Sequence, residues 1–238
     1  VLMLEPLHAC NLKCSGCGRI REYGDSLNRR MSLDECLASL DECGAPILSI
    51  CGGEPLIYPE LEQLIHETIR RKKHIYLCTN GLLLAEKLDI LKPSSRLMLN
   101  IHLDGMRATH DTITCREGTF DQVLDGIREA KKRGFIVYTN TTVYRQTSID
   151  ELAELFTLLT EMKVDGFMLS PAYSYQAVRD DAGDSADDLF MSREYIIEKF
   201  TEARGRLERF RLVTSPLYFD FLCGKRELPC AAWANPTR

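Results

Sequence analysis

The sequence predicts an α/β fold: a partial (β/α)6, TIM-like barrel with an irregular C-terminal extension. Short apolar runs rich in β-formers alternate along the chain with longer stretches whose apolar residues recur at helical spacing. Strands that alternate with helices form parallel sheets with right-handed crossovers, either open or curled into a barrel. Six such repeats favour the partial barrel.

The apolar runs define the strands. We predict strands at residues 1–7, 47–51, 74–79, 97–103, 135–144 and 166–172.

Helices are predicted between the strands from their start signals and apolar faces. Ser32 with Glu35, and Ser148 with Glu151, fit the capping box, and Pro59 suits a first helical turn. Two further helices are predicted at residues 82–91 and 192–209. A helix from Phe120 has one continuous apolar face, formed by Phe120, Val123, Leu124, Ile127 and Ala130.

The chain divides into two predicted parts. Residues 1–209 form the barrel, and residues 210–238 form the extension, which we expect to continue beyond Arg238. We expect both ends to be cut from a longer protein, so that any targeting peptide lies outside this sequence. Residues 179–188 hold five aspartates among small residues and are predicted to be a solvated loop without a function.

Composition narrows the classes of partner. The formal net charge is −5 and the basic residues are scattered, so nucleic acid is not expected as a partner. No apolar run approaches the roughly 20 residues that cross a bilayer. Ten cysteines in a chain of 238 residues do not fit a small disulfide scaffold. We therefore predict a protein of the reducing cytoplasm, where crowded cysteines bind metal.

Three cysteines, Cys10, Cys14 and Cys17, follow the first strand within one loop. A structural zinc site needs four ligands, but the next cysteine, Cys36, falls in a predicted helix. A [4Fe–4S] cluster held by three thiolates keeps one iron open to another ligand. The loop therefore favours an iron–sulfur cluster, with zinc as the alternative.

This loop, with its C-x3-C-x2-C spacing after the first strand, resembles the hallmark of the radical S-adenosylmethionine (SAM) superfamily, whose fold is a partial (β/α)6 barrel. Gly52, Gly53 and Glu54 after the second strand resemble the superfamily's GGEP motif, which implies contact with the methionyl amino group of SAM. Two glycines let the backbone approach a ligand, and a carboxylate suits an ammonium group. The resemblance implies a [4Fe–4S] cluster and SAM as cofactors.

Polar residues at the ends of later strands are further candidates for SAM binding. Asn80, Asp104, Asn140 and Thr142 are expected at the edge where barrel enzymes keep their sites, and the resemblance implies contacts with the ribose and carboxylate of SAM for Asn140 and nearby polar groups. A strand-end turn or cap without cofactor contact is the alternative for each of them. One position departs from the superfamily: many members have an aromatic residue before the third cysteine, where this chain has Gly16.

A second resemblance, to the adenosyl-hopene transferases of hopanoid synthesis, runs through nearly the whole chain. The residues that carry it are Glu5, Pro6, Leu7, Gly16, Cys17, Gly18, Gly44, Ala45, Pro46, Leu77, Cys78, Thr79, Asn80, Arg116, Glu117, Gly118, Ser170, Pro171, Ala172, Tyr173, Pro229, Cys230, Ala231, Ala232 and Trp233. It implies that the 5′-deoxyadenosyl radical adds to the alkene of diploptene, a membrane-soluble triterpene, to make adenosylhopane. It also implies an electron donor such as flavodoxin or ferredoxin, and peripheral contact with the inner face of the membrane.

The new product radical needs a hydrogen atom, and an unligated thiol is a natural donor. Cys51, Cys78 and Cys115 lie near strand ends, and the period-two pattern turns Cys78 toward the lumen together with His74 and Tyr76. The transferase resemblance implies the same role, so Cys78 is the predicted catalytic donor. A buried Cys78 with a purely structural role is the alternative.

Two other functions remain open at this level. One is a radical SAM enzyme that abstracts hydrogen from a peptide or small molecule and releases 5′-deoxyadenosine. The other is a zinc-binding interaction domain without catalysis. Cys230 is also a candidate for the start of a second cysteine cluster.

Overall fold

The computed structural model describes residues 1–172, 176–182 and 189–227, and its centre is one six-stranded sheet. The strands follow one another across the sheet in chain order, and every neighbouring pair is parallel. They are β1 (Leu2–Leu4), β2 (Ile47–Ile50), β3 (His74–Thr79), β4 (Leu97–His102), β5 (Ile136–Val143) and β6 (Gly166–Pro171). This sequential order confirms the predicted partial barrel.

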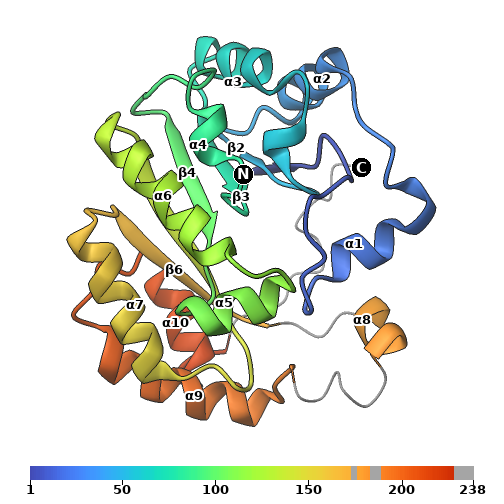
Figure 1. Ribbon diagram of the computed structural model, residues 1–238. Helices are drawn as coiled ribbons and strands as arrows, with labels where there is room; N and C mark the ends of the chain where they lie inside the picture. The colour runs from blue at the N-terminus through green and yellow to red at the C-terminus, as the bar shows by residue number, and fades with distance from the viewer. Residues whose placement is uncertain (173–175, 183–188, 228–238) are drawn as a thin grey trace.

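Helices cover one side of the sheet (Figure 1), where α2 packs on α3, α4 on α6 and α7 on α9. The helices are α1 (Gly18–Tyr23), α2 (Leu33–Cys43), α3 (Leu61–Arg70), α4 (Leu84–Lys87), α5 (Arg107–Thr114), α6 (Thr119–Lys132), α7 (Ile149–Glu161), α8 (Gln176–Ala182), α9 (Arg193–Leu207) and α10 (Pro216–Leu222). No helix in the described part of the chain is long and apolar enough to cross a membrane.

Strand alternation separates the core from the concave side of the sheet. In β5, Val137, Thr139 and Thr141 are fully buried, whereas Asn140 and Thr142, which alternate with them, are partly exposed. Side chains of the first kind face the helices and form the hydrophobic core. Those of the second kind are left on the concave side, where a site can form.

One predicted helix and one predicted helix start need correction. Residues 82–91 contain only the single-turn helix α4 at Leu84–Lys87. The helical spacing of apolar residues arises because leucines in the loops on both sides of α4 are buried as well. Pro59 precedes α3 instead of lying in its first turn. Pro55 starts a 3-10 turn there, and the amide of Leu61 donates to the carbonyl of Tyr58, so the α-helix begins only at Leu61.

The C-terminal part contains more regular structure than its sequence predicts. Helix α10 lies within the predicted irregular extension, and the strand-like segment before it joins β6. The amide of Phe167 donates to the carbonyl of Arg211 at 3.0 Å, and that of Val213 to the carbonyl of Phe167 at 2.9 Å. Helix α8 likewise occupies part of the predicted loop at 179–188. Tyr173, Cys230 and Trp233 lie outside the described residues.

Candidate active site

A cavity of about 380 Å³ opens at the carboxyl edge of the sheet, between the loop after β1 and the ends of the other strands. Ten of the eleven predicted site residues line it: Cys10, Cys14, Cys17, Gly52, Gly53, Glu54, Cys78, Asn80, Asn140 and Thr142. Asp104 is not among them. The parallel strands bring together residues that are far apart in the sequence, because their carboxyl ends meet at one edge.

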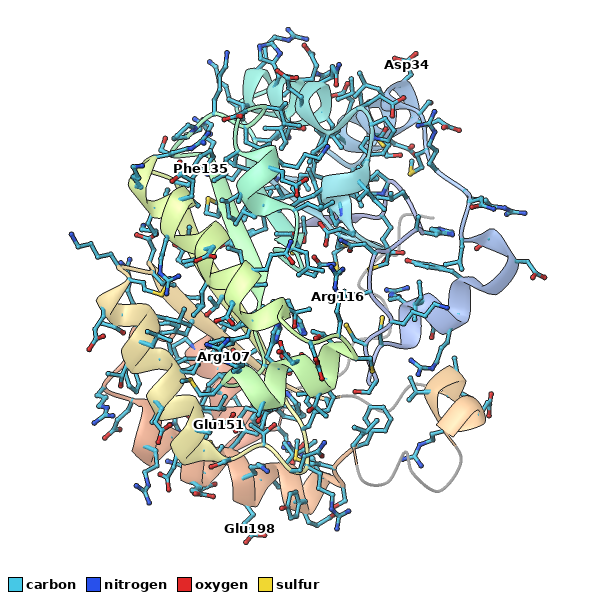
Figure 2. The ribbon with its side chains drawn as sticks, viewed as in Figure 1. Asp34, Arg107, Arg116, Phe135, Glu151 and Glu198 are labelled. Carbon is cyan, nitrogen blue, oxygen red and sulfur yellow. The ribbon has the colours of Figure 1, made fainter. Side chains whose placement is uncertain are left out.

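The backbone of the cysteine loop is held in place by hydrogen bonds with residues of two helices. The amide of Ser15 donates to the carbonyl of Ile113 in α5 at 2.9 Å, and Arg21 of α1 donates to the carbonyl of Cys17 at 2.8 Å. Figure 2, in which sulfur is yellow, shows sulfur atoms gathered between these two helices. The thiols therefore face the cavity while their backbone is fixed outside it.

The thiols of Cys10, Cys14 and Cys17 line one part of the cavity. In the described part of the chain, no group of three or more His, Cys, Asp or Glu side chains is arranged to hold one metal ion. A four-iron cluster is larger, and its thiolate ligands stand further apart around it. Burial raises the pKa of Cys10 to about 11 and raises that of Cys14 further. Iron binding must therefore displace protons from both thiols.

The glycines after β2 line the cavity and also pack closely against the backbone that leads into the cysteine loop. The amides of Gly53 and Glu54 donate to the carbonyls of Leu7 and Ala9 at 3.1 and 2.8 Å. A Cβ at Gly53 would lie 1.9 Å from the carbonyl oxygen of Ala9, and Gly52 has a φ of +110°. Glycine is thus required at both positions by the packing of two backbone segments.

Glu54 lines the cavity but is already well hydrogen-bonded. Its Oε1 accepts from the Thr79 hydroxyl at 2.6 Å and the Leu56 amide at 2.9 Å, and its Oε2 accepts from the Asn80 amide at 2.8 Å. The residue is 1% exposed, and burial raises the pKa of its carboxyl above the ordinary value. The carboxylate therefore ties β3 to the loop after β2 and keeps only part of its accepting capacity for a ligand.

Asn80 connects the end of β3 with the cysteine loop. Its Nδ2 donates to Oδ1 of Asn11 at 2.7 Å and lies 3.9 Å from the sulfur of Cys10. Asn80 therefore lies at the cavity edge, where it was predicted, and also contacts the loop that carries the thiols.

Asp104 lies behind the cavity wall, in contrast to its predicted contact with the cofactor. It is completely buried, and its Oδ1 accepts from the amide of Thr142 at 2.7 Å. Its Oδ2 lies 2.6 Å from Nε2 of His102, a residue that does line the cavity. Burial opposes protonation of His102, but the Asp104 carboxylate raises the pKa of the imidazole above its ordinary value. Asp104 thus fixes two wall residues.

Cys78 faces the cavity, as the period-two pattern predicts. Ile75, Leu77 and Thr79 are buried on the other face of β3. Cys51 also lines the cavity, whereas Cys115 is an exposed residue at the end of α5 and does not.

Several wall residues escape the sequence reasoning, among them Asn100, Arg19 and Tyr144, whereas His102 is expected at this edge as a polar residue that ends the fourth strand. The ring of Tyr144 lies against Gly16: a Cβ at Gly16 would be 2.6 Å from Cε1 of Tyr144. The departure at Gly16 is the signal that could have found it. Tyr144 also has the same strand parity as Asn140 and Thr142, so it turns to the same side.

Two family profiles match the chain. The profile of the Radical SAM superfamily matches residues 4–159, and that of a domain of unknown function, DUF3463, matches residues 167–238.

Similar proteins cover several activities. The GTP 3′,8-cyclase of Clostridium perfringens is 31% identical over 163 residues, which are 66% of this chain and 50% of the cyclase. The AdoMet-dependent heme synthase of Methanosarcina barkeri is 28% identical over 220 residues, 90% of this chain and 61% of the synthase. The chain thus spans about half to three-fifths of these relatives.

Among solved structures, Streptococcus suis SuiB bound to its precursor peptide SuiA superimposes with a TM-score of 0.71 at 17% identity. That alignment covers 94% of this chain and 50% of SuiB. A structure of anSMEcpe with bound AdoMet and a peptide gives a TM-score of 0.62 at 18% identity, over 94% of this chain and 61% of anSMEcpe. At these identities the likeness concerns the fold.

Proposed function

The chain belongs to the radical SAM superfamily, and from this premise we propose that it transfers the 5′-deoxyadenosyl group of SAM to the alkene of the triterpene diploptene, forming adenosylhopane. Superfamily members are enzymes that bind a [4Fe–4S] cluster and SAM. When bound, these groups supply a 5′-deoxyadenosyl radical. Membership favours the iron–sulfur prediction over the zinc-binding alternative.

The proposal assigns roles to residues of the cavity. Cys10, Cys14 and Cys17 hold the cluster, because they are three thiols on one anchored loop that faces the cavity. Glu54, Asn80, Asn140 and Thr142 bind SAM, together with the backbone at Gly52 and Gly53. Asp104 acts behind them by fixing His102 and the backbone of Thr142.

The observation that carries adenosyl transfer is the free thiol of Cys78 on the cavity wall. Addition of a carbon radical to an alkene leaves a radical on the product, which a hydrogen atom must quench. The S–H bond is weaker than most C–H bonds, so Cys78 can give that atom. This leaves a thiyl radical on Cys78, which one electron from the same one-electron donor that reduces the cluster and one proton from solvent return to the thiol. Cys78 shares one cavity with the cluster cysteines, which supports its assignment as the donor.

The alternative within the superfamily is abstraction of hydrogen from a peptide or small molecule, with release of 5′-deoxyadenosine. The names of the similar proteins favour it, since they refer to GTP and heme, and SuiB and anSMEcpe have been solved with peptides. None of these four names refers to hopene. The fate of the adenosyl group separates the two functions.

The test is anaerobic incubation of the reconstituted enzyme with SAM, dithionite and diploptene, followed by mass analysis. Adenosyl transfer gives a product with the combined mass of diploptene, the 5′-deoxyadenosyl group and one hydrogen atom. Release of 5′-deoxyadenosine as the only adenosyl product, with diploptene unchanged, would reject the proposal in favour of hydrogen abstraction.

The proposal also includes the protein's surroundings. A one-electron donor of the flavodoxin or ferredoxin type reduces the cluster, and the enzyme works in the cytoplasm, in peripheral contact with the membrane that holds its substrate. Residues 1–209 form the barrel, and residues 210–238 form an extension whose described part joins β6.

A further inference from the structure

The sulfur of Cys78 lies between polar side chains from the two strands that flank β3. Ser49 of β2 places its Oγ 3.5 Å from Sγ, and Asn100 of β4 places its Nδ2 at 3.6 Å. Asn100 is the register partner of Cys78 across the β3–β4 ladder. The thiol is therefore held from both sides within one layer of the sheet.

The two neighbours can both donate to the sulfur. The Asn100 amide presents its N–H group, and a serine hydroxyl turns freely to donate. If both donate, the sulfur's lone pairs are used and neither neighbour accepts the S–H hydrogen. The S–H bond then points to the remaining side of the sulfur, which faces the cavity.

The amide oxygen of Asn100, Oδ1, indicates that this residue also contacts a bound molecule. Asn100 is 7% exposed, and its Oδ1 is buried without a hydrogen-bond partner among the described residues. An unpaired buried oxygen costs stability, so it points to a group that completes it. Since Asn100 lines the cavity, a hydroxyl group of a bound molecule can donate to this oxygen while Nδ2 holds the thiol.

We propose that Ser49 and Asn100 are positioning residues that direct the S–H bond of Cys78 into the cavity, with Oδ1 of Asn100 left to accept from the bound molecule. The benefit to the reaction rests on the proposed function, because only adenosyl transfer uses Cys78 as a hydrogen donor. Donation by Ser49 and Asn100 to the sulfur is a property of the chain and can be tested without turnover.

The direct test is alkylation of the thiols in the full-length protein without cofactors, using iodoacetamide and peptide mass analysis. Cys115, exposed and outside the cavity, is the internal reference. Asn100→Asp turns the donor into an acceptor of equal shape, and Ser49→Ala removes the hydroxyl. Hydrogen-bond donors stabilise the reactive thiolate, so we expect alkylation of Cys78 relative to Cys115 to slow about tenfold in Asn100→Asp. Ser49→Ala should slow it less, and Ser49→Thr, which keeps the hydroxyl, should restore it.

Matched controls are Asn28→Asp and Ser39→Ala, at positions outside the cavity. An unchanged ratio of Cys78 to Cys115 alkylation in both Asn100→Asp and Ser49→Ala would overturn the proposal. With diploptene, both variants should form the adenosyl adduct but a smaller saturated fraction than the wild type. If the wild type forms no adduct, the proposed function fails, whereas the alkylation ratio still decides whether Ser49 and Asn100 donate to the sulfur of Cys78, which is the arrangement that directs its S–H bond into the cavity.

Discussion

At the scale of residues, some side chains that line the cavity also hold its surrounding backbone segments in place by hydrogen bonds. Glu54 and Asn80 face the cavity, and both also bind groups that fix the cysteine loop or the strand ends around it. A change at either position should therefore alter folding as well as binding. Experiments at this scale have to measure the two effects separately.

The cluster cysteines give the simplest test. Cys14→Ala should abolish binding of the [4Fe–4S] cluster after anaerobic reconstitution, because each thiolate is one of only three anchors. Iron and acid-labile sulfide analysis with visible absorbance measures this, with Cys115→Ala as the control that should retain the cluster. A full cluster in Cys14→Ala, or in the matching variants of Cys10 or Cys17, would contradict the assignment.

Glu54→Gln should lower stability and SAM affinity while leaving cluster assembly intact. Glutamine keeps one oxygen but places an NH₂ group against at least one of the three donors, namely the Thr79 hydroxyl and the amides of Leu56 and Asn80. We expect a loss of about 2 kcal/mol in the free energy of unfolding by urea. The control is Glu62→Gln on the exposed face of α3. Unchanged stability together with unchanged SAM affinity would remove Glu54 from both roles.

His110 predicts a dependence of stability on pH. Burial and, to a smaller extent, the nearby His102 lower its pKa from 6.5 to about 4, against the opposing effect of Asp104 and Asp111. The unfolded chain therefore binds a proton at higher pH than the folded one. The stability contribution is complete above pH 6.5 and is lost as the pH falls toward 4, by about 3 kcal/mol at most.

Urea denaturation between pH 7 and pH 4 measures that loss. The slope of stability against pH should become shallower in His110→Gln, and it should stay unchanged in His66→Gln, since His66 is exposed. An equal slope in wild type and His110→Gln would show that other groups cause the acid sensitivity.

At the scale of elements, the sequence predicts best where a period and an end signal coincide. Strand β3 occurs over the predicted residues 74–79, because its alternating side chains are buried on one face and partly exposed on the other. The short helices α1, α5 and α10 were missed. Helix α1 has six residues and no side-chain cap, so neither periodicity nor a start signal marks it.

In helix α2 the predicted capping box is present and should contribute to the stability of the protein. The Ser32 hydroxyl accepts from the amide of Glu35, and the Glu35 carboxylate accepts from the amide of Ser32 at 2.7 Å. Ser32→Ala should therefore lower stability by about 1 kcal/mol, measured as the urea midpoint. Ser39→Ala, a change near the middle of the same helix, serves as the control. An equal effect of the two substitutions would contradict the capping contribution.

At the scale of the whole molecule, the site is a product of strand order. Sequential parallel strands bring the loop after β1 and the ends of β2 to β6 around one cavity, which is why ten of eleven predicted site residues meet there. Asp104 is the exception, because which side chain of a strand end reaches the cavity depends on local packing. Tyr144 against Gly16 and Asn100 beside Cys78 are contacts between distant segments, and periodicity within one segment does not predict them.

In the proposed reaction, the adenosyl group is joined to an alkene and the Cys78 thiol supplies the final hydrogen. A thiol exchanges its hydrogen with solvent, so the most direct measurement is the mass of the adenosyl product formed from diploptene and SAM in D₂O. We predict adenosylhopane that carries one deuterium, and little saturated product from Cys78→Ala, which should instead give unsaturated or diverted adduct. Adenosylhopane without deuterium, or 5′-deoxyadenosine as the only adenosyl product, would contradict the account.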